Sequence, residues 1–334
     1  MSHIVPIVRA AALAPFLSWM RVNGIAPEAR LQAAGLPAGL LGEPERLIPL
    51  IAGARFVRDA SRAYGPDLGC RVVSDTSIAE LAAFGRVALG ARTPRGAFKR
   101  LMQVYAHHSS HELFVVSDDA NGLTMRHSFL FRFDAETLHA CHQYVAAMAR
   151  AVLAGTGHRG PRLARIAIIP HPEAGLGHLR GRLDVDPGPA TDGVLTVTMP
   201  NDALDRPYLR QGRDRGPDNG LAEALSRIRG EGTLEASLRI ILPGMLDHGT
   251  PTLKDLAELV PTSPRTFQRR LAAEGHSLSA LIRDVRREQA LARLAHGREP
   301  LAVIAAELGY SAQSSLSRAA RRWTGAPPSR LRGT

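Results

Sequence analysis

Apolar side chains recur at helical spacing twice in the last quarter of the chain. The first stripe occupies positions i, i+3, i+4 and i+7 and consists of Leu253, Leu256, Ala257 and Val260. The second stripe repeats this spacing 48 residues further on and consists of Leu301, Ile304, Ala305 and Leu308. Such a stripe predicts an amphipathic helix. Each stripe is followed by a tight turn and a serine, Ser263 or Ser311, so the sequence predicts one motif used twice.

A second, short helix is predicted after each serine. Ser263 can cap the first of these helices, with Pro264 at its first position. The apolar inner faces consist of Phe267 with Leu271, and of Leu316 with Ala320. A helix, a tight turn and a second helix with an exposed polar face make a helix-turn-helix unit.

The outward sides of these two short helices are polar. On the first helix the side consists of Arg265, Gln268 and Arg269, which we call the first recognition face. On the second it consists of Gln313, Ser314, Ser317, Arg318 and Arg321, the second recognition face. An arginine fork fits the O6 and N7 acceptors of guanine, and glutamine fits adenine. Serine and arginine also suit phosphate contacts, so both faces are candidates for binding duplex DNA.

One long helix is predicted between the two units. Ser277 can cap its start, and Gly297 can end it after His296. Such a helix is about 30 Å long, close to the roughly 34 Å of one turn of B-DNA. It therefore has the length to place the two recognition faces in successive major-groove segments. A further helix with the stripe Leu234, Leu238, Ile241 and Met245 is expected to open this domain.

Positive charge is concentrated in the same part of the chain. The 334 residues carry 42 Lys+Arg and 31 Asp+Glu, a net charge of +11. From Pro251 to Thr334 there are 14 basic and 7 acidic residues, so the last quarter holds +7 of this charge. Basicity of this size favours an anionic partner, either nucleic acid or an acidic membrane surface. Together with the repeated motif it favours DNA over a purely structural helical bundle.

The rest of the composition is that of an ordinary globular chain, with 45% apolar and 22% charged residues. Two cysteines, Cys70 and Cys141, exclude a disulfide framework and lack metal-ligand spacing. No apolar run approaches the roughly 18 residues of a membrane-spanning helix. Pro15 interrupts the apolar segment Ala10–Met20, which we interpret as an amphipathic helix rather than a signal peptide. We therefore expect a cytoplasmic protein with no membrane partner.

The C-terminal motifs closely resemble those of the AraC/XylS family of bacterial transcription regulators. The resemblance covers about 100 residues and rests on Ala305–Ser311, Ser314–Arg318 and Arg322–Arg330, and on Pro264–Gly275 with Arg286 and Ala290. It implies an all-α domain of seven helices with two helix-turn-helix units and binding to promoter DNA. By position, it assigns base reading to Arg265, Gln268, Arg269, Gln313, Ser314, Ser317 and Arg318.

The sequence departs from this family in the second unit. The family usually carries phenylalanines where this chain has Leu316 and Ala320. Ala320 leaves less apolar volume beneath the second recognition face. We therefore expect the second unit to be less rigidly packed and to contribute less to sequence specificity.

The N-terminal residues resemble the arabinose-binding-type regulatory domain of one branch of this family, which includes ornithine-utilisation and virulence regulators. The resembling segments are Gly24–Pro27 to Gly35–Pro37, Leu89–Pro94 and Met199–Pro207. The resemblance implies a module that binds a small effector or dimerises, so that a homodimer, an unknown effector and RNA polymerase are the expected partners besides promoter DNA. An activator is the expected mode of action.

The pattern of the first 200 residues predicts helices and one small sheet, an α+β domain. The expected helices are 10–22, 28–34, 48–64, 78–89, 94–105 and 135–153, and the expected strands are 113–117, 123–132, 165–169 and 194–199. The Gly-, Pro- and charge-rich segment after residue 205 is typical of a linker, with a short helix at 221–229. We expect a regulatory domain at 1–215, a linker at 216–232 and the double helix-turn-helix domain at 233–334.

Histidines give the N-terminal part its most noticeable chemistry. His107 and His111, and separately His139 and His142, have spacings that could place two imidazoles on one helix face. A metal site needs three or four such ligands, and the alternatives are an effector pocket or a structural set of histidines. We favour the structural interpretation and expect no metal, no cofactor and no catalytic residue. The candidate polar groups of an effector pocket are His111, Glu112, His127 and His142.

Two other functions remain open at this point. A DNA-repair alkyl transferase fused to the DNA-binding module would need a reactive cysteine in a cationic setting. Cys70 precedes Arg71 and Cys141 precedes His142, yet the sequence has no Pro-Cys-His-Arg-like motif. A nucleoid-binding protein would bind DNA weakly, without sequence preference and with strong salt dependence.

Overall fold

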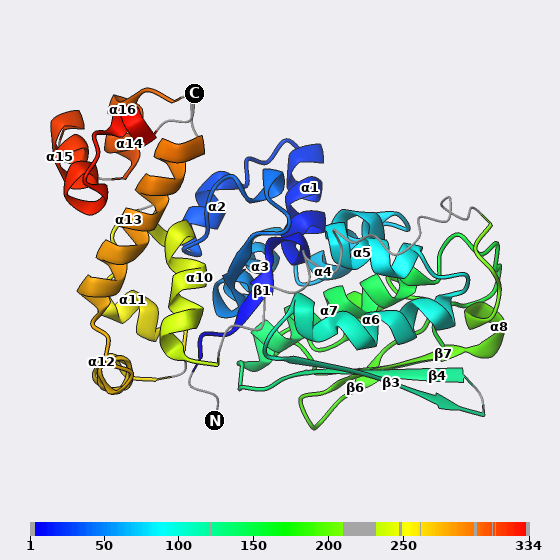
Figure 1. Ribbon diagram of the computed structural model, residues 1–334. Helices are drawn as coiled ribbons and strands as arrows, with labels where there is room; N and C mark the ends of the chain where they lie inside the picture. The colour runs from blue at the N-terminus through cyan, green and yellow to red at the C-terminus, as the bar shows by residue number, and fades with distance from the viewer. Residues whose placement is uncertain are drawn as a thin grey trace. The chain divides into compact units, whose positions relative to one another are not determined.

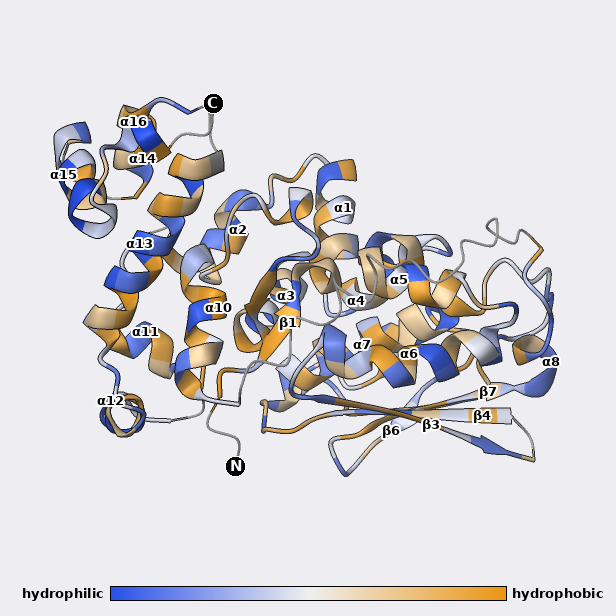
Figure 2. Ribbon diagram, in the orientation of Figure 1, coloured by the Kyte–Doolittle hydropathy of each residue, from blue (hydrophilic) through white to orange (hydrophobic). Residues whose placement is uncertain are grey.

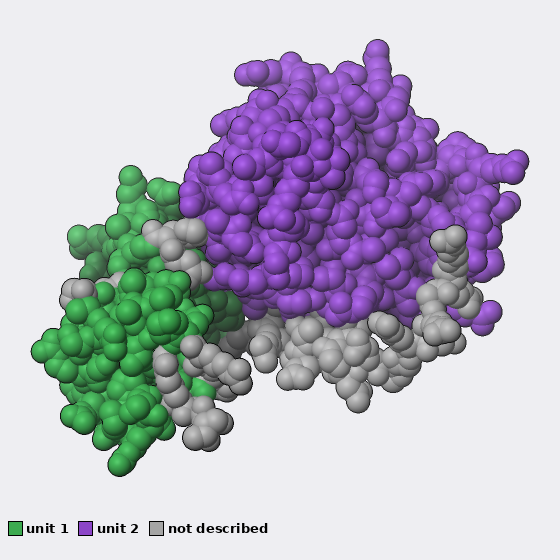
Figure 3. All heavy atoms as spheres, turned by 90° about the horizontal axis from the view of Figure 1, so that it is seen from above, with its two compact units in different colours: residues 1–5, 230–334 green, residues 6–229 purple. Residues whose placement is uncertain are grey.

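The structure is a computed structural model that describes residues 4–120, 122–209, 232–246, 249–260, 262–296, 299–308, 310 and 312–331. The chain divides into two compact units (Figure 3). One unit is Pro6–Arg229, and the other combines Met1–Val5 with Gly230–Thr334. The predicted linker and the predicted helix at 221–229 lie outside the described residues, apart from Gly232.

The larger unit contains a five-stranded sheet. Across the sheet the strands are β3 (Glu112–Asp119), β4 (Gly122–Phe129), β7 (Leu195–Pro200), β5 (Arg165–Ile168) and β6 (Gly188–Pro189). Neighbouring strands are antiparallel except β5 and β6, which are parallel. The predicted hairpin is β3–β4, in which Leu113 lies opposite Ser128. β4 ends at Phe129 rather than at Arg132, since the chain then turns toward Asp134, which caps the next helix.

Two long helices cover one face of this sheet, α6 (Pro94–His108) and α7 (Ala135–Val152) (Figure 1). Side chains define where both begin: Thr93 Oγ1 accepts a hydrogen bond from Gly96 N at 3.3 Å, and Asp134 Oδ1 from Thr137 N at 2.8 Å. The buried core between the layers includes Phe98, Leu101, Leu123, Met125, Ala146, Leu195, Val197 and Met199. Figure 2 shows hydrophobic residues along both layers, interspersed with hydrophilic ones.

The remaining helical elements of this unit are η1 (Ala10–Leu13), α1 (Ala14–Val22), α2 (Glu28–Ala33), η2 (Leu40–Gly42), α3 (Leu50–Tyr64), α4 (Leu68–Arg71), η3 (Ser77–Leu81), α5 (Ala82–Leu89), η4 (Gly177–Leu179) and α8 (Asn201–Leu204). Of these, α3, α4 and η3 pack directly on α7. The helix predicted at 48–64 begins two residues later, because β2 (Leu47–Pro49) pairs antiparallel with β1 (Ile7–Arg9). This two-stranded sheet was not predicted. The helix predicted at 78–89 is broken at Ala82, whose φ is 49°. Together these elements form an α+β domain.

The described part of the smaller unit is helical. Its helices are α10 (Leu234–Leu246), α11 (Leu253–Ala257), α12 (Pro264–Ala273), α13 (Leu278–His296), α14 (Leu301–Glu307), α15 (Gln313–Thr324) and α16 (Pro328–Leu331). Of the predicted stripe on α10, Leu234, Leu238 and Ile241 are buried, and Met245 is half-buried. In neither unit does a described helix have the length and apolarity needed to cross a membrane.

Candidate DNA-binding surface and internal cavity

The first helix-turn-helix unit consists of α11 and α12, and side chains define the start of both helices. Asp255 N donates to Thr252 Oγ1 at 3.2 Å, while Thr252 N donates to Asp255 Oδ2 at 2.8 Å. This reciprocal pair is a capping box. Ser263 Oγ accepts from Thr266 N at 3.2 Å, and Pro264 occupies the first helical position. The predicted cap of α12 is therefore confirmed, and it sets the direction in which this helix leaves the turn.

One side of α12 is apolar and buried, and the other is polar and exposed. Phe267 and Leu271 are fully buried, whereas the first recognition face, Arg265, Gln268 and Arg269, is exposed. Within the described part of the chain, none of these three side chains forms a hydrogen bond or ion pair with another protein group. Their donors are thus available to a ligand. Three exposed guanidinium and amide groups along one helix side suit the acceptors on base edges in the major groove.

The second unit consists of α14 and α15. Leu316 and Ala320 are buried on the inner side of α15. Of the second recognition face, Gln313, Ser314, Arg318 and Arg321 are exposed and Ser317 is half-buried. Figure 2 shows mostly hydrophilic residues along α15. Its N-cap is Ala312, which makes no side-chain cap, and Ser311 lies outside the described residues.

The long helix α13 runs from Leu278 to His296, close to the predicted bounds. Ser277 Oγ accepts from Ala280 N at 3.3 Å, which confirms its predicted capping role. With 19 residues, the helix is about 29 Å long. Toward its end, Ala290 and Leu294 join the buried core that lies under α14 and α15. The second unit therefore shares its core with the helix that links it to the first.

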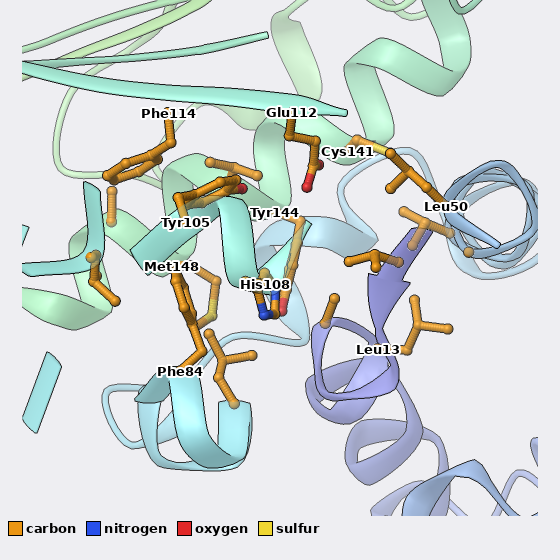
Figure 4. A pocket seen from close by; sticks show the side chains of 18 of the residues that line it. Leu13, Leu50, Phe84, Tyr105, His108, Glu112, Phe114, Cys141, Tyr144 and Met148 are labelled. Atoms are coloured by element: carbon orange, nitrogen blue, oxygen red, sulfur yellow. The ribbon is translucent and has the colours of Figure 1, made fainter. Parts of the chain in front are cut away.

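The larger unit contains a mostly apolar cavity of about 120 Å³ that is partly open to solvent (Figure 4). It is lined by residues from β1, η1, α3, η3, α5, α6, β3, β4 and α7. Most of the lining is aliphatic or aromatic and includes Leu13, Leu50, Val57, Phe84, Phe114 and Met148. Five lining residues carry polar side-chain atoms: Tyr105, His108, Glu112, Cys141 and Tyr144. A mostly apolar cavity with a few converging polar groups is typical of a small-molecule site.

Burial and neighbouring side chains together determine the charge of these polar groups. Burial raises the pKa of Glu112, but contacts with His127 and Ser109 outweigh it and hold this pKa below the usual value. Burial lowers the pKa of His108 to about 4. At neutral pH the cavity therefore presents a carboxylate at Glu112 and an uncharged imidazole at His108. Burial raises the pKa of both Tyr105 and Tyr144, so both phenols keep their protons.

The four candidate effector-binding residues occupy different places. Glu112 lines the cavity, and Figure 4 shows its carboxylate pointing into it. His127 lies behind it, with Nε2 3.3 Å from Glu112 Oε1. The ring of His142 is 5.6 Å from that of His127 and stacks on Phe129. His111 Nδ1 lies 2.7 Å from Ser110 Oγ, and His111 is not among the lining residues.

Two family models match the chain, one in each unit. A helix-turn-helix domain model matches residues 256–334. The model described as the arabinose-binding domain of AraC transcription regulators, N-terminal, matches residues 24–175. The chain belongs to the AraC family of transcription regulators.

The individual relatives match this chain over only about a quarter to a third of its length. The HTH-type transcriptional regulator VirS of Mycobacterium tuberculosis is 44% identical over 88 residues, 26% of each chain. The ornithine utilization regulator of Pseudomonas aeruginosa is 36% identical over 102 residues, 30% of each chain. The chain thus spans about a quarter to a third of the length of these relatives. The crystal structure of the transcriptional regulator CdpR from Pseudomonas aeruginosa is 18% identical, with a TM-score of 0.42 and coverage of 95% and 96% of the two chains.

In this AraC-family chain, sequence reasoning missed four polar residues of the cavity. They are Tyr105, His108, Cys141 and Tyr144. The spacing of these residues could have indicated a shared site. Tyr105 and His108 are spaced i, i+3 on α6, and Cys141 and Tyr144 have the same spacing on α7, so each pair shares a helix face. The predicted helical pair His107 and His111 is wrong: α6 ends at His108, and His111 lies outside it next to β3.

Proposed function

We propose that this chain is a sequence-specific transcription regulator, an activator that binds promoter DNA through both recognition faces. The observation that carries the proposal is the exposed first recognition face. Arg265, Gln268 and Arg269 lie side by side on a helix held by a capped turn and a buried Phe267. This arrangement suits direct readout of bases. The second recognition face contributes more phosphate contacts, since serine and Arg321 suit positioning rather than readout.

The N-terminal unit, in this proposal, controls DNA binding through a small effector or through homodimerisation, and the activator contacts RNA polymerase. Membership of the AraC family supports this part. The cavity supports an effector in particular, since its apolar lining offers a small molecule a volume that is mostly shielded from solvent. A ligand that binds only the folded unit raises its stability, so effector binding is open to a direct measurement.

The cysteines argue against the alkyl-transferase alternative. Burial raises the pKa of Cys70 to about 12 and raises that of Cys141 further. Both thiols are therefore protonated at neutral pH. A nucleophilic cysteine needs the opposite shift, because the thiolate is the reactive form.

Fluorescence anisotropy with labelled DNA from upstream of the chain's own gene and its neighbours tests the proposal. We expect binding that unlabelled copies of the same fragment compete far better than random DNA of equal length. Equal competition by random DNA, with strong weakening by salt, would overturn sequence specificity and support a nucleoid-binding protein. Transcription of a reporter from the bound fragment then tests activation, and light scattering tests the homodimer.

A further inference from the structure

The size of the cavity limits what it can hold. Its volume is about 120 Å³, and an engineered apolar cavity of about 150 Å³ in another protein binds benzene. A molecule with one aromatic or aliphatic ring is therefore the right scale. Phe84, Phe114 and Met148 offer it apolar contacts on the side of α5, β3 and α7.

Two polar atoms at this cavity have no partner within the described part of the chain. They are the hydroxyl of Tyr144 and Nδ1 of His108, and both are fully buried. In Figure 4 the hydroxyl of Tyr144 is drawn beside the imidazole of His108, and the carboxylate of Glu112 points into the cavity from β3. A buried polar group without a partner costs about 1–3 kcal/mol. The cavity thus contains two groups that a polar ligand head would satisfy, in addition to a carboxylate.

The charge of the lining selects the kind of head. Glu112 is the one acidic residue among the described lining residues, and the lining includes no lysine or arginine. With His108 uncharged at neutral pH, a ligand carboxylate or phosphate would be buried against Glu112 without a compensating cation in the lining. Burying an unpaired charge is strongly unfavourable. A donor of hydrogen bonds, by contrast, is stabilised by the carboxylate.

From this geometry we infer that the cavity binds a compact, mainly apolar molecule with a single hydrogen-bond-donating head, a hydroxyl or a protonated amine. The head donates to the carboxylate of Glu112, and the buried groups of His108 and Tyr144 line the same cavity. The ring or alkyl body fills the space between α5, α6, α7 and β3. This inference rests on the proposed function only for its consequence, the control of DNA binding, and not for the binding itself.

Four probes of one size test the inference on the full chain: benzyl alcohol, benzylamine, benzoate and toluene. We expect benzyl alcohol, benzylamine or both to raise the melting temperature in a dose-dependent way and to give saturable heat in calorimetry. Benzoate should have no effect, and toluene a smaller one. Failure of both donor probes, or stabilisation by benzoate equal to theirs, would overturn the inference. A cavity filled only by water would give the first of these results.

Variants show whether a stabilising probe occupies this cavity. Tyr144→Phe removes a hydroxyl that has no protein partner, so the melting temperature should stay the same or rise while benzyl alcohol binds several-fold more weakly. Glu112→Gln should weaken benzylamine about tenfold or more, as expected for a hydrogen bond to a charged group. Glu173→Gln, at an exposed glutamate of the same unit, is the matched control and should change nothing. Unchanged probe binding in both cavity variants would overturn the assignment.

The outcome is separable from that of the proposed function. Anisotropy of promoter DNA is measured on the same preparations without any probe. If DNA binding is sequence-specific and no donor probe binds, the ligand class is wrong and the regulator stands. If a donor probe binds and DNA binding lacks specificity, the cavity assignment stands and the proposed regulator does not.

Discussion

The side-chain carboxylate of Glu274 accepts a hydrogen bond from the backbone N–H of Leu234 at 3.0 Å. Its second oxygen accepts from Glu235 N at 2.9 Å. Glu274 directly follows α12, and Leu234 is the first residue of α10. One carboxylate thus satisfies two unpaired amides at the start of α10, where the helix dipole also favours a negative charge. The first recognition helix and the helix that opens the domain are thereby joined.

Replacing Glu274 should loosen this junction. We expect Glu274→Ala to lower the free energy of unfolding by about 1–2 kcal/mol, the usual cost of losing a helix cap. Hydrogen–deuterium exchange of the peptide that covers α10 should become faster. Glu274→Gln keeps one acceptor oxygen and should have a smaller effect. Equal exchange in wild type and Glu274→Ala would show that the contact contributes nothing.

The second unit depends on a small aliphatic core. Leu316 is fully buried there with Ile304 and Leu294. Leu316→Ala should cost about 2–5 kcal/mol of stability, through lost burial and the cavity left behind. Val303→Ala, at a side chain that is 41% exposed on α14, should stay within about 0.5 kcal/mol. Urea denaturation measures both, and a similar loss in the two variants would contradict this account of the core.

Base reading by α12 should depend on Arg269. If its fork binds guanine, Arg269→Ala costs about 1–3 kcal/mol of binding free energy and relaxes specificity at one base pair. Arg132→Ala removes an exposed arginine from the other unit and controls for net charge. Anisotropy against a set of single-base variants of the bound fragment measures both effects. A uniform loss over all fragments would place Arg269 on phosphate instead.

Arg321 should behave differently because its expected partner is a phosphate. Arg321→Ala should weaken binding about equally for all DNA fragments. It should also reduce the slope of log affinity against log salt concentration by about 1, the value expected for one lost phosphate contact. Titrations at several salt concentrations check this. A change in base preference without a change in slope would assign Arg321 to base reading.

Buried histidines should make the larger unit sensitive to acid. Burial lowers the pKa of both His108 and His139 to about 4, below the 6.5 of an exposed histidine. The unfolded chain therefore binds more protons between these values, so stability is full above pH 6.5 and falls as the pH decreases toward 4. Carboxylates with lowered pKa, such as Glu136, lose their contribution only below about pH 4.5.

Denaturation in urea at several pH values tests this sign. His108→Gln keeps a neutral polar side chain and should reduce the loss of stability between pH 6.5 and 4. Glu112 raises the pKa of His108, whereas Arg9 lowers it. Glu112→Gln should therefore lower this pKa further and increase the loss of stability between pH 6.5 and 4. Stability that rises as the pH falls through this window would contradict the burial of neutral imidazoles.

The helices and caps of the smaller unit were predicted correctly because they depend on residues that are close together in the sequence. The caps at Ser263 and Ser277 and the buried pair Phe267 and Leu271 follow from short-range rules of spacing and capping. In the larger unit, β1 pairs with β2 across almost 40 residues, and that pairing decided where α3 begins. A local sequence pattern cannot predict such a pairing, because it depends on which distant segment of the chain lies next to the strand in the folded structure.

By itself, the sequence determined the two helix-turn-helix units, their exposed arginine and glutamine faces and the family to which the chain belongs. These features repeat within a few turns of helix, so spacing alone reveals them. Only the tertiary structure decided that Tyr105, His108, Glu112 and Tyr144 meet around one cavity. They come from three elements, α6, β3 and α7, and a shared cavity arises from the packing of helices on a sheet. The same packing excludes water, which keeps His108 neutral, and it places His127 against Glu112, which keeps that carboxylate charged.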